Sequence, residues 1–153
     1  MIIAPILLAS MVSASPGPSV PLALTLDTPA KVGNIETVCT GVGLDARQNA
    51  AWTSYPLRIE VAGRGGQYLG DVNLTISQGS SVLATVTCAG PWLLFRLPAG
   101  RYKVEAGTEG KSVTSPVLVP ATGQSRVILR FPDLGGVIEV PGTNPPASLP
   151  LMQ

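Results

Sequence analysis

Residues 72–88 read VNLTISQGSSVLATVTC, and this stretch decides the fold class. In its first half, polar residues alternate with three apolar ones, Val72, Leu74 and Ile76, which is the two-residue period of a half-buried strand. The Gln-Gly-Ser sequence that follows favours a turn. Alternate residues of the second half are predicted to share the inner face: Val82, Ala84, Val86 and Cys88. The stretch therefore predicts a hairpin packed on a core.

Similar segments flank this hairpin on both sides. They are β-branched or alternating runs bounded by Gly or Pro: 35–40, 57–61, 92–97, 102–106, 113–119 and 127–131. About seven short strands at this spacing predict an all-β fold, a seven-stranded antiparallel β-sandwich with Greek-key or meander connections. Residues 92–97 are almost continuously apolar, which is typical of a central strand. The one predicted helix is short and Ala-rich, near 44–53, anchored by Leu44 and Trp52.

The composition excludes several functions. Charged residues form 12% of the 153 residues, with ten Lys plus Arg against nine Asp plus Glu, so we expect no nucleic-acid partner. The chain has no histidine, which excludes Ser-His-Asp and Cys-His catalysis and ordinary zinc sites. We therefore predict no cofactor, no metal and no enzymatic activity.

The N-terminus indicates export. An apolar run at 2–9 precedes the small-residue sequence Val12-Ser13-Ala14, so residues 1–14 are predicted to be a signal peptide, although no Lys or Arg begins it. The alternative is an uncleaved anchor helix, but prolines interrupt the apolar stretch before it reaches the ~20 residues of a membrane span. The predicted location is periplasmic or secreted, with no stable span after cleavage.

The same composition gives the domain organisation. We predict a Pro-rich linker at 15–34 that lies along the domain, a folded β-sandwich at 35–131 and a Pro-rich flexible tail at 132–153. Cys39 and Cys88 are the only cysteines, and two cysteines in an exported chain usually pair, so we predict a disulfide. A redox-active pair is the weaker alternative, because no Cys-x-x-Cys motif or neighbouring basic residue is present.

Residues 90–102, GPWLLFRLPAGRY, contain a Leu-Pro-x-Gly-x-Tyr sequence. This sequence resembles the carboxypeptidase regulatory-like domains of exported bacterial proteins, and the likeness covers about residues 36–131. The resemblance implies a transthyretin-like sandwich, a fold grouped with carbohydrate-binding-like modules, and an accessory role without peptidase activity. Pro98 and Gly100 would make a tight reversal, and Tyr102 would place its ring in the core with its hydroxyl bonded to backbone at the sheet corner.

Aromatic residues beside turns are the only binding candidates. Trp52, Tyr55 and Tyr68 could stack on sugars if they were exposed on one face, whereas core packing explains them equally well. Trp92 and Tyr102 are assigned to the core. The charged side chains are interpreted as solvated strand faces, without a paired catalytic or calcium site: Asp45, Glu60, Asp71, Glu105, Glu109, Arg58, Arg64, Arg96 and Arg101.

These observations favour a non-catalytic exported module that gives a structural or protein-interaction surface in the cell envelope. Its partner would be an unknown envelope protein or a polysaccharide. The alternative function is a carbohydrate-binding module for glycan or cell-wall polysaccharide. An enzyme that uses carboxylates or a Ser-Lys pair is the third hypothesis, and no motif supports it.

Overall fold

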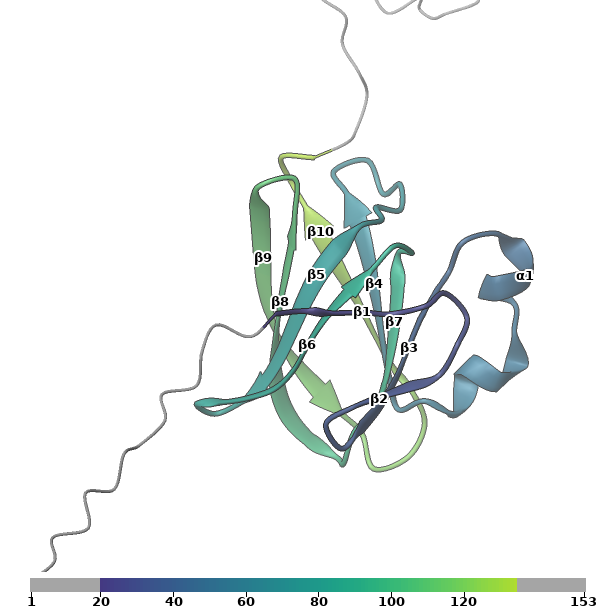
Figure 1. Cartoon of the computed structure of the whole chain (residues 1–153), viewed down its shortest axis with the longest axis vertical. Helices are drawn as coiled ribbons and strands as arrows, with labels where there is room; N and C mark the ends of the chain where they lie inside the picture. The colour runs from purple at the N-terminus through teal and green to yellow at the C-terminus, as the bar shows by residue number, and fades with distance from the viewer. Residues whose placement is uncertain (1–19, 135–153) are drawn as a thin grey trace, which may run out of the picture.

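Two five-stranded sheets pack face to face in the computed structural model, which describes residues 20–134 (Figure 1). The predicted signal peptide, the start of the predicted linker and the tail from residue 135 lie outside the described residues. The first sheet has the strand order β1 (Leu22–Ala23), β6 (Ser81–Cys88), β5 (Val72–Gln78), β8 (Gly100–Thr108) and β9 (Lys111–Val119). The second has the order β10 (Ser125–Phe131), β4 (Leu57–Gly63), β7 (Trp92–Arg96), β3 (Ile35–Thr40) and β2 (Ala30–Val32).

The all-β sandwich is confirmed, but it has ten strands where seven were predicted. Two strands, β1 and β2, come from the stretch interpreted as a linker, where the prolines hide any strand period. Two pairs are also parallel, β1 with β6 and β10 with β4, against the prediction of antiparallel pairing. The alternation of residues predicts where a strand lies and which face is buried. The neighbouring strand, and whether the pair is parallel or antiparallel, depends instead on how the chain crosses between the sheets.

The core lies between the sheets and consists of their inward-facing residues. Val72, Leu74 and Ile76 on β5 are fully buried, as the alternation predicts. On β6 the prediction holds for Ala84, Val86 and Cys88 but is wrong for Val82, which is 60% exposed. The register of β5 with β6 shifts after Ile76, where a bulge adds one residue to β6 and turns the next side chain outward.

The central strand and the helix are both present. Strand β7 lies between β3 and β4, and its first four residues are buried, as expected of a central strand. The helix α1 ends at Arg47 (Leu44–Arg47), and a 3-10 turn, η1 (Ala50–Ser54), follows it. Trp52 is buried, which agrees with its predicted anchoring role, whereas Leu44 is 61% exposed and does not anchor the helix. None of the helices within residues 20–134 has the length and apolar character needed to cross a membrane.

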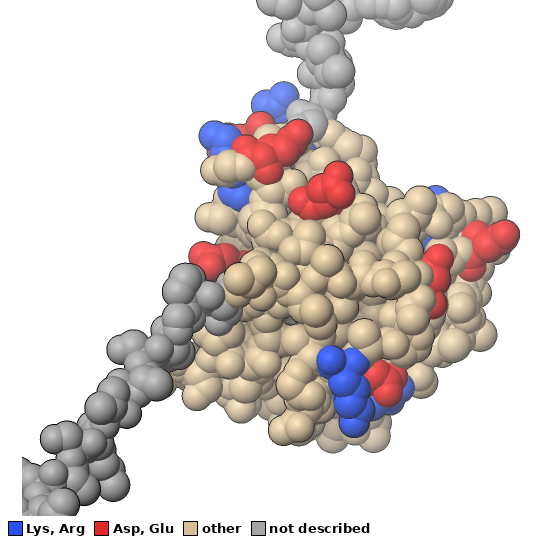
Figure 2. Space-filling model, in the orientation of Figure 1, with Lys and Arg blue, Asp and Glu red and all other residues tan. Residues whose placement is uncertain are grey.

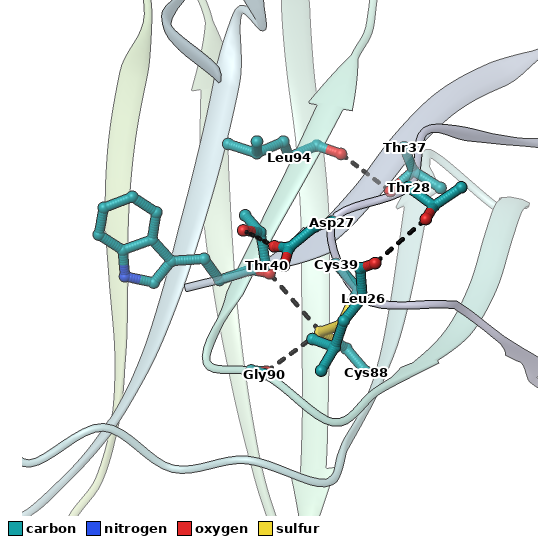
Figure 3. The surroundings of a disulfide bond; sticks show 10 residues. Leu26, Asp27, Thr28, Thr37, Cys39, Thr40, Cys88, Gly90 and Leu94 are labelled. Carbon is teal, nitrogen blue, oxygen red and sulfur yellow. Dashed lines mark hydrogen bonds between the residues drawn. A yellow bond between two sulfur atoms is a disulfide. The ribbon is translucent and has the colours of Figure 1, made fainter. Parts of the chain in front are cut away.

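The predicted disulfide is confirmed, and it joins the two sheets. Cys39 on β3 and Cys88 on β6 are fully buried, with their Cα atoms 5.5 Å apart (Figure 3). The segment before β2 lies beside this bridge, since the Asp27 N–H donates to the Cys39 carbonyl at 2.8 Å and the Thr40 hydroxyl donates to the Asp27 carboxylate at 2.6 Å. The disulfide therefore connects the two layers, and hydrogen bonds attach the N-terminal segment beside it.

The corner predicted at residues 97–102 is also present. Tyr102 is 6% exposed, and its hydroxyl donates to the Pro98 carbonyl at 2.7 Å. Burial of the hydroxyl raises the pKa of Tyr102. Gly100 at the strand start has a backbone conformation, φ 155°, that side chains rarely adopt.

Replacing Tyr102 with Phe is expected to lower the free energy of unfolding by about 1 kcal/mol, because the Pro98 carbonyl loses its donor while the ring stays packed. Urea unfolding of Tyr102→Phe measures this loss. Tyr68→Phe, whose hydroxyl binds a charged carboxylate instead, provides the comparison and is expected to lose more. An unchanged Tyr102→Phe midpoint would show that the hydroxyl does not stabilise the corner.

Candidate functional site

The outer face of the second sheet carries a group of polar and aromatic side chains that contact one another. Along β3, β4, β7 and β10, side chains alternate between the core and the outer face, and the outward ones form this group. Their register forms two rows, Glu60–Trp92–Thr40 and Arg58–Leu94–Val38. The segment that contains α1 and η1 lies over this face, where Trp52 and Tyr55 pack with Val38 and Leu94.

Glu60 is the centre of this face, and it is only 1% exposed. Its carboxylate forms an ion pair with Arg58 at 2.9 Å, accepts hydrogen bonds from both Nε and Nη2 of Arg126, and accepts another from the Tyr68 hydroxyl at 3.0 Å. We call these four residues the Glu60 cluster. The interpretation of Glu60 as a solvated strand residue was wrong, because alternation cannot show that a second layer covers the outer face.

The electrostatics of the Glu60 cluster keep the carboxylate ionised. Burial by itself would raise the pKa of Glu60, but hydrogen bonds from Arg126 and Tyr68 and the charge of Arg58 outweigh it, so the pKa lies below its ordinary value. The same hydrogen bond raises the pKa of Arg126. Arg58 and Arg126 are 21% and 52% exposed, so the buried negative charge is paired with one largely buried cation and one half-exposed cation.

Cation–π and edge-to-face aromatic contacts extend the Glu60 cluster. The Arg58 guanidinium lies 4.3 Å from the centroid of the Trp92 ring, and Arg47 of α1 lies 5.3 Å from that of Tyr68. Tyr68 and Trp92 meet edge to face, with centroids 6.3 Å apart. Gly41 covers Trp92 so closely that an added Cβ would lie 2.7 Å from the ring. Tyr68 is thus held by its hydroxyl, by Arg47 and by Trp92.

A second group of contacts fixes the other end of the segment that contains α1 and η1. The Tyr55 hydroxyl donates to Glu36, and Arg96 stacks 4.5 Å over the Tyr55 ring. Burial, together with the hydrogen bond to Glu36, raises the pKa of Tyr55 to about 12. The Gln124 side chain donates to the carbonyls of Trp52 and Tyr55 at 2.8 and 2.9 Å.

The three predicted ligand-binding residues do not form one exposed face. Trp52 and Tyr55 are 6% and 3% exposed, whereas Tyr68 is 39% exposed. Trp92 and Tyr102 are 5% and 6% exposed, so both are buried as predicted, but only Tyr102 packs in the core between the sheets, whereas Trp92 lies on the outer face of the second sheet. Tyr68 is therefore the one nominated residue that keeps an accessible ring.

A small pocket lies beside Tyr68. It has a volume of about 200 Å³, and the loop before β5 and the turn between β8 and β9 line it with Tyr68, Leu69, Gly70, Asp71, Thr108 and Glu109. The pocket brings together the carboxylates of Asp71 and Glu109, which no sequence pattern pairs. Within residues 20–134, no group of three or more His, Cys, Asp or Glu side chains could hold a metal ion.

Sequence reasoning missed Arg47 and Arg126. Arg126 faces Glu60 only because β10 pairs in parallel with β4, with Arg126 opposite Arg58. Arg47 reaches Tyr68 only because α1 folds back over the sheet. The available signal was a carboxylate two residues after Arg58 on one strand, and this pattern identifies neither Arg47 nor Arg126.

No protein-family model matches this chain, and no curated protein is significantly similar to it.

Proposed function

We propose that this chain is an exported, non-catalytic β-sandwich module that binds a protein of the cell envelope through the surface of α1 and Tyr68. We call this the α1–Tyr68 surface and define it by Val42, Leu44, Arg47 and Tyr68. The first two are 56% and 61% exposed, and Tyr68 is 39% exposed. The resemblance to accessory domains of exported bacterial proteins, stated above from residues 90–102, agrees with this proposal.

The observation that carries the proposal is the fixed position of the exposed Tyr68 ring. Its hydroxyl is bonded to the buried Glu60, and Arg47 and Trp92 pack against the ring. An exposed aromatic side chain that is ordered before binding loses little entropy in a complex, and Tyr and Arg are enriched among residues that dominate binding energy. Exposed apolar side chains next to such residues are typical of interaction sites.

Export is supported by two independent features. Residues 1–14 have the pattern of a signal peptide. The Cys39–Cys88 disulfide is consistent with an oxidising compartment outside the cytoplasm.

The protein-binding proposal is tested by comparing two Leu→Asp variants. Leu44 lies on the α1–Tyr68 surface and Leu118 on the outer face of the other sheet, and both are 61% exposed. Co-precipitation of envelope proteins with the tagged full chain is measured for each variant. A discrete partner that is retained by Leu118→Asp and lost with Leu44→Asp is the expected result. Equal retention by both variants would contradict the α1–Tyr68 surface.

The pocket beside Tyr68 favours carbohydrate as the second candidate. An aromatic ring next to Asp71, Glu109 and the Thr108 hydroxyl offers stacking and hydrogen bonds to one sugar unit. Polysaccharides are titrated against the protein with Trp fluorescence, because Trp92 contacts Tyr68. Saturable quenching that persists in Tyr68→Phe and disappears in Tyr68→Ala would support stacking. No response to a panel of glycans and peptidoglycan would contradict it.

A further inference from the structure

Strand β10 is an open edge of the second sheet. It pairs with β4, and no other strand within residues 20–134 pairs with it. Its seven residues include no proline, whereas β1 and β2 have only two and three residues and β9 contains Pro116. Short length and proline protect an edge against further pairing, so β10 is the edge of the described chain that can best accept another strand.

The backbone of β10 has hydrogen-bonding groups on this open side. The Ser125 N–H donates to the Pro56 carbonyl at 2.8 Å, on the side of β4. Because N–H groups alternate in direction along a strand, those of Arg126, Ile128 and Arg130 point to the open side. A strand added there would therefore find donors and acceptors spaced for pairing.

The sequence after β10 has the pattern of a turn followed by a strand. Residues 131–134 form a turn, in which the Leu134 N–H donates to the Phe131 carbonyl at 3.3 Å. Residues 135–140 read GGVIEV, so two glycines precede β-branched residues that surround one glutamate. Such residues are typical of strands. We call residues 137–140 the VIEV segment.

The position of Leu134 brings the VIEV segment within reach of the open side. The Leu134 carbonyl accepts the Arg64 N–H at 2.7 Å. Arg64 follows Gly63, which pairs with Phe131, so Leu134 lies just beyond the end of β10. The open side is one strand spacing away, about 4.8 Å. Residues 135 and 136 span up to about 7 Å, and as glycines they adopt the backbone conformations of a tight reversal.

We propose that the VIEV segment pairs with β10 as an antiparallel strand and closes this edge of the second sheet. With residues 132–135 as the connecting loop, Glu139 lies opposite Ile128. Val137 then lies opposite Arg130, and the N–H groups on the open side of β10 find acceptors. A closed edge protects the sandwich from pairing with strands of other proteins, whichever partner binds the α1–Tyr68 surface.

The apolar residues of the VIEV segment agree with this register. Ile138 lies opposite Leu129, on the inner face. Val140 lies opposite Val127, which packs against the core but is only partly buried. The added strand would therefore extend the apolar core, which favours pairing. Pro141 comes next and has no N–H group, so the strand ends there.

The charges agree with the same register. Glu139 lies on the outer face, diagonal to Arg126 and Arg130, and long side chains reach such diagonal neighbours. Both arginines are exposed, and none of the ion pairs between residues of the described chain includes Arg130. Figure 2 shows the surface over β1 and the β5–β6 hairpin as an uncharged area between charged regions, which offers Glu139 no cation. Charge complementarity therefore favours β10.

Hydrogen exchange of backbone amides, measured by NMR on the full chain, tests this strand. We expect the Ile128 and Glu139 amides to exchange about tenfold more slowly in the wild type than in Ile138→Asp, which places a charge on the inner face. Leu149→Asp changes another apolar residue after β10 and should leave both rates within about threefold of the wild type. Slow exchange of the Leu74 amide, in the buried centre of β5, reports that each variant remains folded.

A charge exchange tests the register. Glu139→Lys should speed the exchange of the Ile128 amide about threefold, because the lysine would lie between two arginines. Adding Arg130→Glu should recover most of this loss. Adding Lys103→Glu, a charge reversal on the first sheet, should recover none of it. A double variant with Arg130→Glu that exchanges as fast as Glu139→Lys alone would overturn the register.

Three results would overturn the added strand. Ile128 and Glu139 amides that exchange in the wild type at the rate of an unfolded peptide refute it. Protection that Leu149→Asp removes as fully as Ile138→Asp would come from another part of the chain. Protection that appears only at high concentration, together with a dimer in sedimentation velocity, would show that β10 pairs with the VIEV segment of a second copy instead.

Discussion

Reducing the Cys39–Cys88 disulfide is expected to lower the free energy of unfolding by about 4 kcal/mol, because the bridge closes a long loop in the unfolded chain. The sequence separation is 49 residues, and the bridge joins β3 in one sheet to β6 in the other. Its removal therefore frees the unfolded chain and disconnects the two layers at once. Urea unfolding of the oxidised and reduced protein, at the same pH, measures the difference.

The control for this experiment is the double variant Cys39→Ala, Cys88→Ala. Reductant should not change its stability, and its unfolding midpoint should lie at or below that of the reduced wild type, because both sites are fully buried and lose side-chain atoms. An unfolding midpoint that reductant leaves unchanged in the wild type would show that the disulfide does not constrain the fold.

Replacing Glu60 with Gln is expected to lower the free energy of unfolding by about 3 kcal/mol, since it leaves the largely buried Arg58 without its counter-ion. The value lies at the low end of the range for broken buried pairs, because Arg126 is half exposed and can turn to water. Unfolding by urea at neutral pH measures it. Glu105→Gln, an exposed position on β8, is the matched control and should change stability by less than about 0.5 kcal/mol.

The pH dependence gives a second readout of the same carboxylate. The pKa of Glu60 is lowered by folding, so its ionised form stabilises the native state above the ordinary glutamate value of 4.5, and this stabilisation is lost as the pH falls toward the lower folded value. The difference between wild type and Glu60→Gln should be constant from neutral pH to about pH 5 and shrink below that. A difference that does not shrink in acid would contradict the ionised, ion-paired state.

The core-facing residues could be predicted from the sequence, because a strand with one buried face alternates apolar and polar residues. Val72, Leu74 and Ile76 follow this period and are buried, and Tyr102 closes the predicted corner. The period fails at Val82, where one extra residue in β6 reverses the side that faces the core. No residue type in that stretch marks the bulge, so its position depends on the pairing with β5.

The candidate site could be predicted much less well. Trp52, Tyr55 and Tyr68 were nominated together, and the structure buries the first two beneath their own segment while Tyr68 stays accessible. Glu60 and Arg126 are 66 residues apart and meet only through the parallel pairing of β4 and β10. Such a contact leaves no local pattern, because each side chain alone looks like an ordinary outward-facing charge.

The sequence by itself determined the all-β class, the buried central strand at 92–97, the pairing of Cys39 with Cys88 and the absence of histidine chemistry. These properties follow from local alternation and from residue counts, which need no knowledge of the partner strand. Only the tertiary structure decided the ten-strand arrangement, the Glu60 cluster and the pocket beside Tyr68. Each of these depends on which segments, distant in sequence, lie side by side. Strand register and the crossings between sheets determine these neighbours, and they form only when the whole chain folds.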